Sequence, residues 1–138
     1  MKLHWDKLLS DTRVDKPGIP KSDPRDEFRS PFEADYDRVI YSTPFRRLAR
    51  KTQVHPHALN DHVRTRLTHS LEVASVGRTL GAKLAKFLKE RGELPRNRTA
   101  HDITWIMLAA CAAHDIGNPP FGHAGEEAIR EWALRHPK

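Results

Sequence analysis

The sequence predicts an all-α protein, and three observations lead to this fold class. Apolar side chains recur at the three- and four-residue spacing of amphipathic helices in several segments. No segment shows the two-residue alternation that is typical of a half-buried strand. Clusters of proline and glycine separate the periodic segments, as expected of the turns between helices.

Residues 1–32 are expected to form an irregular N-terminal arm, and residues 33–138 to form the helical part. The chain between Ser10 and Pro31 contains four prolines and many charges but no periodic apolar face. One or two amphipathic turns can form near the start of the chain, around Leu3, Trp5, Leu8 and Leu9.

The first substantial helical segment covers residues 33–50, where Pro44 predicts a kink or a break. A short loop, residues 53–61, follows it. His55 and His57 flank a proline in this loop, and we interpret them as solvent-exposed side chains rather than as extra metal ligands.

The longest helix is expected over residues 62–91, with Asn60 or Asp61 as its N-cap because either side chain can accept a hydrogen bond from the first turn. Gly77 and Gly81 each weaken this helix by ~1 kcal/mol relative to alanine. In return, the two glycines allow a neighbouring helix to approach closely.

Residues 102–113 are nearly all apolar, and a helix that is apolar on most sides is a central core helix. A turn rich in glycine and proline follows, and then an amphipathic helix over residues 123–136. Trp105 and Trp132 fit core packing better than stacking on nucleotide bases.

The bulk composition excludes some classes of protein. A net charge of +6 and a pI near 9.8 favour anionic partners such as nucleotides or nucleic acid. A disulfide within the chain is impossible with Cys111 alone, and a lone apolar thiol suits a reducing cytoplasm. The N-terminus has no apolar signal region, and no segment approaches the ~20 apolar residues of a membrane helix. We therefore expect a soluble, cytoplasmic protein with no membrane partner.

His114 and Asp115 lie where the core helix opens into the Gly/Pro turn. A buried charge must be paired or bound to a metal, so the pair predicts a metal site at a cleft. The two residues alone are equally compatible with simple capping of the helix end. His69 favours the metal, because it adds a second imidazole with Arg66 one turn away. Nitrogen and oxygen ligands of this kind suit Mn, Fe, Ni, Co, Zn or Mg.

Two further groups of residues leave alternatives open. His123 and Glu126 are three residues apart and can touch on one helical turn, yet the residues alone favour an ordinary helix start with a favourable dipole. A solvated basic face is at least as good an interpretation as a phosphate or single-stranded DNA contact for the cluster Arg46, Arg47, Arg50 and Lys51.

Four blocks of the sequence resemble the HD-domain deoxynucleotide triphosphohydrolases, the dGTPase family. In order, the blocks are Tyr41-Ser-Thr-Pro-Phe-Arg-Arg-Leu48, Lys51-Thr-Gln53, Arg64-Thr-Arg-Leu-Thr-His-Ser-Leu-Glu-Val73 and Ala113-His-Asp-Ile-Gly-Asn-Pro-Pro-Phe-Gly-His123. They fall at family-like spacing between about Glu33 and Trp132. A lone His-Asp dipeptide would carry little weight, whereas four ordered blocks are specific.

The resemblance implies hydrolysis of a deoxynucleoside triphosphate, dGTP or another dNTP, to the deoxynucleoside and inorganic triphosphate. It implies a divalent metal cofactor, with Mn or Mg first and Fe, Ni, Co or Zn as alternatives. Carried over by position, it implies metal ligands at His69, His114 and Asp115, catalytic residues at His123 and Glu126, and substrate contacts at Gln53 and Arg66.

The chain departs from this family in length. Relatives are several times longer and supply a fourth metal ligand, an Asp on a downstream helix, whereas this chain ends at Lys138. We therefore expect the N-terminal part of an HD-domain helical bundle, incomplete at the C-terminus and not competent alone. Full-length relatives often form homo-oligomers, and some bind single-stranded DNA. The alternatives are a catalytically inactive module that binds nucleotides or single-stranded DNA, and an HD phosphodiesterase acting on another phosphorylated nucleotide.

Overall fold

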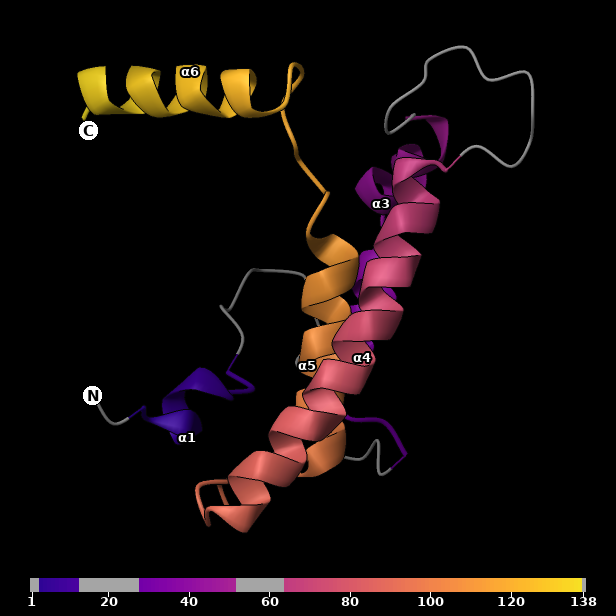
Figure 1. The fold of residues 1–138 in the computed structure, drawn as a ribbon, viewed down its shortest axis with the longest axis vertical. Helices are drawn as coiled ribbons and strands as arrows, with labels where there is room; N and C mark the ends of the chain where they lie inside the picture. Colours follow the sequence, from indigo (N-terminus) through magenta and orange to yellow (C-terminus); the bar gives the residue numbers. More distant parts are fainter. Residues whose placement is uncertain (1–2, 13–27, 52–63, 138) are drawn as a thin grey trace.

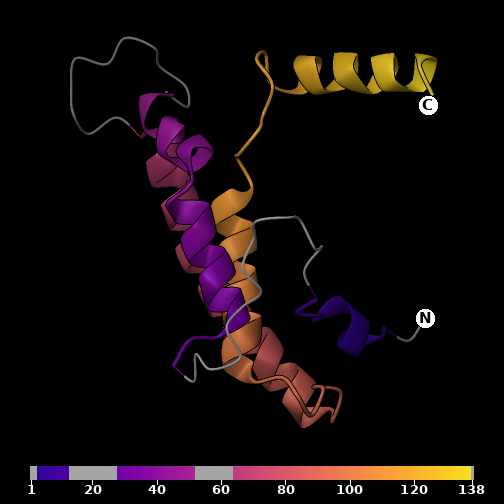
Figure 2. The same cartoon turned by 180° about the vertical axis from the view of Figure 1, so that it is seen from behind.

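The structure is a computed structural model that describes residues 3–12, 28–51 and 64–137, and all regular structure in these ranges is helical. Two antiparallel helices, α4 and α5, form the centre, and α2 packs against α5 (Figures 1 and 2). The all-α prediction is confirmed. The elements are α1 (Trp5–Leu8), α2 (Pro31–Ile40), α3 (Thr43–Arg47), the 3₁₀ turn η1 (Leu48–Arg50), α4 (Arg66–Glu90), α5 (Ala100–Ala113) and α6 (His123–Arg135).

The helix α2 begins at Pro31, two residues before the expected start, because Ser30 caps it. The Ser30 hydroxyl accepts a hydrogen bond from the backbone N–H of Phe32, and proline suits the first helical turn. The expected disruption near Pro44 is a break, since α2 ends at Ile40 and Ser42 caps a separate helix, α3.

The N-cap of α4 differs from the prediction. Thr65 caps the helix in a reciprocal capping box with Thr68, so α4 begins at Arg66 rather than at residue 62. The predicted caps, Asn60 and Asp61, lie outside the described residues. Thr99 and Asp102 form a second capping box, which starts α5 at Ala100, two residues before the expected position.

Gly77 and Gly81 bring α4 and α5 into close contact, as predicted. A Cβ atom at position 77 would lie 2.4 Å from the Sγ of Cys111. One at position 81 would lie 3.0 Å from the Cα of Thr104 and 3.1 Å from the Cβ of Met107. Neither glycine leaves room for a larger side chain without movement of α5.

The buried residues form two clusters along α5. The first joins α3 and η1 to α4 and α5, and Trp105 packs against it with its ring centroid 5.5 Å from that of Tyr36. Burial, and next the negative charge of Asp37, raise the pKa of Tyr36. The second cluster joins Leu9 to the far end of the helix pair. The prediction that Trp105 packs in the core is therefore confirmed, because this side chain packs against a buried cluster.

The prediction that Trp132 packs in the core is wrong. Trp132 is 62% exposed, and its ring stacks on the ring of His136. The whole of α6 buries no residue and extends away from the other helices (Figure 1). The predicted helix is present, but its amphipathic spacing does not specify which surface covers the apolar face. No helix among the described residues is long and apolar enough to span a membrane.

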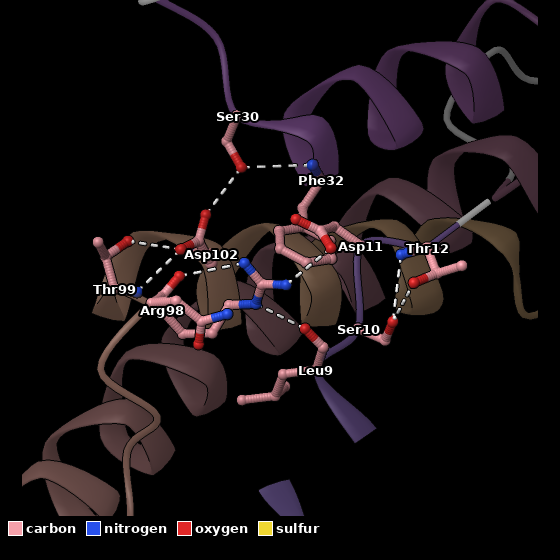
Figure 3. Close-up of polar contacts among 10 residues, drawn as sticks. Leu9, Ser10, Asp11, Thr12, Ser30, Phe32, Arg98, Thr99 and Asp102 are labelled. Carbon is pink, nitrogen blue, oxygen red and sulfur yellow. Dashed lines mark hydrogen bonds and ion pairs between the residues drawn. The ribbon is translucent and has the colours of Figure 1, made fainter. Parts of the chain in front are cut away.

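Arg98 fastens the N-terminal segment to the helix pair (Figure 3). Its Nε donates to the carbonyl of Leu9 at 2.6 Å, and its Nη2 lies 3.0 Å from the carboxylate of Asp11. The guanidinium also lies over the ring of Phe32, 5.4 Å from the centroid. Beside it, Asp102 accepts hydrogen bonds from Ser30 and from the cap residue Thr99. One side chain thus links the arm, α2 and the start of α5.

Arg98→Ala is expected to release residues 3–12 from the helices, because a charge-assisted hydrogen bond and an ion pair are lost together. The loss is worth roughly 2 kcal/mol, or about 30-fold in amide exchange protection of the segment. Hydrogen exchange measures it directly. Arg96→Ala is the matched control, since Arg96 is exposed and has no ion pair within the described ranges. Equal exchange in both variants would contradict this account of the arm.

Candidate metal centre

Two of the predicted metal ligands meet where the start of α4 lies beside the end of α5 (Figure 1). His69 is in the first turn of α4, and His114 is the C-cap residue of α5. Their imidazole centroids are 5.2 Å apart, with the rings nearly perpendicular at 75°. The antiparallel pairing of the two helices therefore brings together histidines that are far apart in the sequence.

The ring of His114 is held in one orientation by its own helix. Its Nδ1 lies 2.7 Å from the carbonyl oxygen of Cys111. A carbonyl oxygen can only accept, so Nδ1 carries the hydrogen and donates it. In the neutral ring, Nε2 then keeps its lone pair and is the nitrogen that can bind a metal. His114 is exposed, which leaves this nitrogen accessible.

Asp115 is the buried carboxylate of the site, with its side chain 6% exposed. Its Oδ1 accepts a 2.7 Å hydrogen bond from Nη1 of Arg66 and another from the side-chain amide of Asn118. Its Oδ2 is buried and has no hydrogen-bond partner among the described residues. A buried carboxylate oxygen without a partner is costly, and a bound cation would satisfy it.

The donor set fits a divalent cation in kind: two imidazole nitrogens and one carboxylate oxygen suit Mn, Mg, Fe, Co, Ni or Zn better than a soft ion. The side chains do not converge on one point, however. Within residues 3–12, 28–51 and 64–137, no three His, Cys, Asp or Glu side chains are arranged to hold a metal ion. The structure brings His69 against His114 and ties Asp115 to Arg66.

A cavity of about 420 Å³ opens beside Asp115. Arg66 and Asp115 form one side of it, and the turn that follows α5 forms another. The backbone of Phe121 in this turn has φ 69°, a conformation that non-glycine residues rarely adopt. The lining residues are Arg50, Lys51, Arg66, Asp115, Asn118, Pro119, Pro120, Phe121 and Gly122.

The predicted catalytic pair comes together, but apart from the metal ligands. Nδ1 of His123 lies 3.2 Å from a carboxylate oxygen of Glu126 in the first turn of α6, as their spacing predicts. Both residues are exposed, and neither has a hydrogen bond or ion pair to His69, His114 or Asp115 in the described structure. Gln53, the predicted nucleoside contact, lies outside the described residues, as do His55 and His57.

Comparison with known protein families shows which family the chain belongs to. The family model described as "HD domain" matches residues 66–138, more than half of the chain. The chain belongs to the HD-domain family. The matched range includes both halves of the site, Arg66 with His69 on α4 and His114 with Asp115 after α5. It also includes α6.

This HD-domain chain is similar to bacterial proteins named deoxyguanosinetriphosphate triphosphohydrolase-like protein. It is 54% identical over 130 residues to one from Pseudomonas aeruginosa, covering 94% of this chain and 28% of that protein. It is 50% identical over 138 residues to one from Synechocystis, covering 96% and 30%. It is 46% identical over 133 residues to one from Listeria monocytogenes, covering 94% and 28%. The chain spans less than a third of the length of these curated relatives.

Two residues that contact the candidate ligands were not predicted from the sequence. Asn118 donates to Asp115 from three residues further along the chain, a spacing that could have suggested the contact. The backbone carbonyl of Cys111 orients His114, and the identity of the Cys111 side chain gives no indication of this contact. Arg66, which the sequence predicts as a substrate contact, also pairs with Asp115 in the structure.

Proposed function

We propose that the protein is a metal-dependent phosphohydrolase that cleaves deoxynucleoside triphosphates to the deoxynucleoside and inorganic triphosphate. The observation that carries this proposal is Asp115. One of its oxygens is fixed by Arg66 and Asn118, and the other is buried without a partner beside His114. The cation-lined cavity next to it and the names of the similar proteins support a nucleotide as the substrate.

His69, His114 and Asp115 would hold the divalent cation. When bound, the cation would polarise phosphate oxygens and lower the pKa of an attacking water. Cys111 keeps Nε2 of His114 available through the hydrogen bond to Nδ1. Arg66 lines the cavity and pairs with Asp115, so its remaining donors can bind phosphate oxygens in a planar, bidentate manner. Gln53 is proposed to contact the nucleoside.

His123 and Glu126 are proposed to transfer protons to and from the reacting groups near the α-phosphate. Their observed contact lets the Glu126 carboxylate fix the orientation of the imidazole. The pair stands at the start of α6, directly after the turn that lines the cavity. A small movement at Gly122, whose φ is 54°, would redirect the helix start relative to the cavity.

Product identification tests the reaction. Because this chain matches 28% of the Pseudomonas aeruginosa relative, residues 1–138 can replace the matching N-terminal part of that protein. The chimera is incubated with dGTP and Mn²⁺, and its products are separated by chromatography. Deoxyguanosine and inorganic triphosphate in equal amounts are expected. dGMP with pyrophosphate would show cleavage between the α- and β-phosphates instead of at the ester bond to the nucleoside, and would rule out this reaction in favour of another HD phosphohydrolase activity. Binding without turnover would favour a nucleotide-binding module.

Glu126→Gln in the chimera is expected to lower kcat about 100-fold or more, since proton transfer by a positioned pair contributes at least that much. Metal content should stay at the wild-type level, because Glu126 has no contact with the proposed ligands among the described residues. Glu127→Gln is the matched control: Glu127 is the next residue and pairs only loosely with Arg130, at 3.7 Å. A similar loss of kcat in both variants would remove Glu126 from the proposed role.

Asn118→Ala is expected to weaken Mn²⁺ binding about 10- to 100-fold, the usual effect of removing a residue that holds a ligand in place. The variant leaves Oδ1 of Asp115 with Arg66 alone, so the carboxylate can turn. Isothermal titration with Mn²⁺ measures the change. Asn97→Ala, in the exposed loop before α5, is the control. Unchanged Mn²⁺ affinity in Asn118→Ala would show that Arg66 alone positions Asp115.

A further inference from the structure

The basic cluster at the end of α3 and in η1, Arg46, Arg47, Arg50 and Lys51, divides into two pairs in the structure. Arg50 and Lys51 line the 420 Å³ cavity that also contains Arg66 and Asp115. Arg46 and Arg47 do not line it. They line a neighbouring cavity with Thr43 and Ala49, and Arg50 and Lys51 line both cavities. Four cations that look equivalent in sequence therefore differ in position.

The charges of Arg50 and Lys51 are not neutralised within the described structure. Among the described residues that line the 420 Å³ cavity, Asp115 is the one carboxylate, and it pairs with Arg66 at 2.7 Å. Neither Arg50 nor Lys51 forms an ion pair with any described carboxylate. The described part of the cavity wall thus carries two cations in excess, which favours an anion with more than one negative charge.

The backbone that carries these two cations is fixed. Leu48, the first residue of η1, is 3% exposed and belongs to the buried cluster under α4 and α5. The carbonyl of Lys51 accepts a 3.0 Å hydrogen bond from the N–H of Arg66, which ties η1 to the first residue of α4. This hydrogen bond places Lys51 next to Arg66. Because the backbone is already ordered, binding an anion there costs less conformational entropy.

We propose that Arg50 and Lys51, together with Arg66, bind the polyphosphate chain of the nucleotide. This inference rests on the proposed function and extends its site. Arg66 is held at Asp115 and serves the phosphate nearest the metal ligands, so Arg50 and Lys51 serve the phosphates further along the chain. A cavity of 420 Å³ is within the range of small-molecule sites, which favours a compact polyphosphate over a nucleic-acid strand.

Inorganic tripolyphosphate is the direct probe, because its binding requires neither the metal nor turnover. The 138-residue chain is titrated calorimetrically in 150 mM NaCl with EDTA. The double variant Arg50→Ala/Lys51→Ala is compared with Arg46→Ala/Arg47→Ala, which removes the same charge from the neighbouring cavity. All four residues are exposed, so thermal melting should be unchanged in both variants. At this ionic strength, salt screening keeps the effect of distant charges on the measured affinity small.

The expected result is at least a tenfold weaker affinity for tripolyphosphate in Arg50→Ala/Lys51→Ala, and less than a threefold change in Arg46→Ala/Arg47→Ala. The conservative swap Arg50→Lys/Lys51→Arg should restore most of the affinity. Equal weakening in both double variants, or no weakening in the first, would overturn the proposal. If a single-stranded oligonucleotide binds more tightly than tripolyphosphate and loses affinity equally in both variants, the cluster is a nucleic-acid surface instead.

The outcome is separable from that of the proposed function. Hydrolysis of dGTP by the chimera with no special effect of Arg50 and Lys51 would reject this inference and leave the reaction standing. Selective loss of tripolyphosphate binding in a protein that hydrolyses no dNTP would reject the reaction and keep the anion site.

Discussion

His114→Ala is expected to abolish Mn²⁺ binding and to lower metal-dependent hydrolysis by more than about 100-fold. Residues that merely orient a ligand cost 10- to 100-fold when replaced, so loss of a ligand should cost more. The variant removes the imidazole whose Nε2 is kept free by the hydrogen bond from Nδ1 to Cys111. It also removes the ring in contact with His69, so the site loses its best-defined nitrogen.

The fold should tolerate this change. His114 is exposed and follows the last residue of α5, so its replacement opens no cavity in the core. His101→Ala is the matched control, because His101 is another exposed histidine on the same helix, far from Asp115. Mn²⁺ titration and chromatography of the dGTP products, each measured on both variants in the chimera, give the answer. Retained Mn²⁺ affinity in His114→Ala, or an equal loss in His101→Ala, would contradict the assigned ligand.

Gly81→Leu is expected to have the largest effect on stability, lowering the free energy of unfolding by about 3 kcal/mol, at the upper end of typical overpacking costs. The Cβ atom would lie 3.0 Å from the Cα of Thr104 and 3.2 Å from the carbonyl oxygen of Ile103, and backbone atoms cannot turn aside. The better helix propensity of leucine recovers only ~1 kcal/mol. The helices α4 and α5 must therefore separate to accept the side chain.

Thermal or urea unfolding checks this effect, with Ala82→Leu as the control. Ala82 is the next residue of α4 and is exposed, so the same side chain there meets solvent. Because α4 and α5 also carry His69 and His114, Gly81→Leu should weaken Mn²⁺ binding as well. Equal stability of the two leucine variants would mean that the close packing of α4 on α5 does not set the stability of the protein.

Much of the fold could be predicted from local sequence, because helix periodicity and glycine spacing are local signals. The apolar composition of residues 102–113 predicts a core helix, and the spacing of Gly77 and Gly81 predicts close contact between helices. Asn60 and Asp61 are candidate caps of α4 because an Asn or Asp before an apolar run often caps a helix. The observed cap is Thr65, which forms reciprocal hydrogen bonds with Thr68. The partner of an amphipathic helix is not a local property, and Trp132 was misplaced for that reason.

The site shows the same division. His114 was placed at the end of a core helix from the spacing of apolar residues, and the structure confirms that position. The pairing of Arg66 with Asp115 spans 49 residues and depends on the register of α4 against α5, which no local pattern encodes. The separation of Arg50 and Lys51 from Arg46 and Arg47 likewise depends on the bond between Lys51 and Arg66.

Anomalous diffraction from crystals of the protein soaked in Mn²⁺ tests the central claim most directly. The account predicts one strong anomalous peak about 2.0–2.3 Å from Nε2 of His114 and from Oδ2 of Asp115, with His69 turned toward it. Oδ1 of Asp115 should remain with Arg66 and Asn118. Strong Mn²⁺ peaks elsewhere in the crystal, with Oδ2 of Asp115 still buried and unbound, would contradict it.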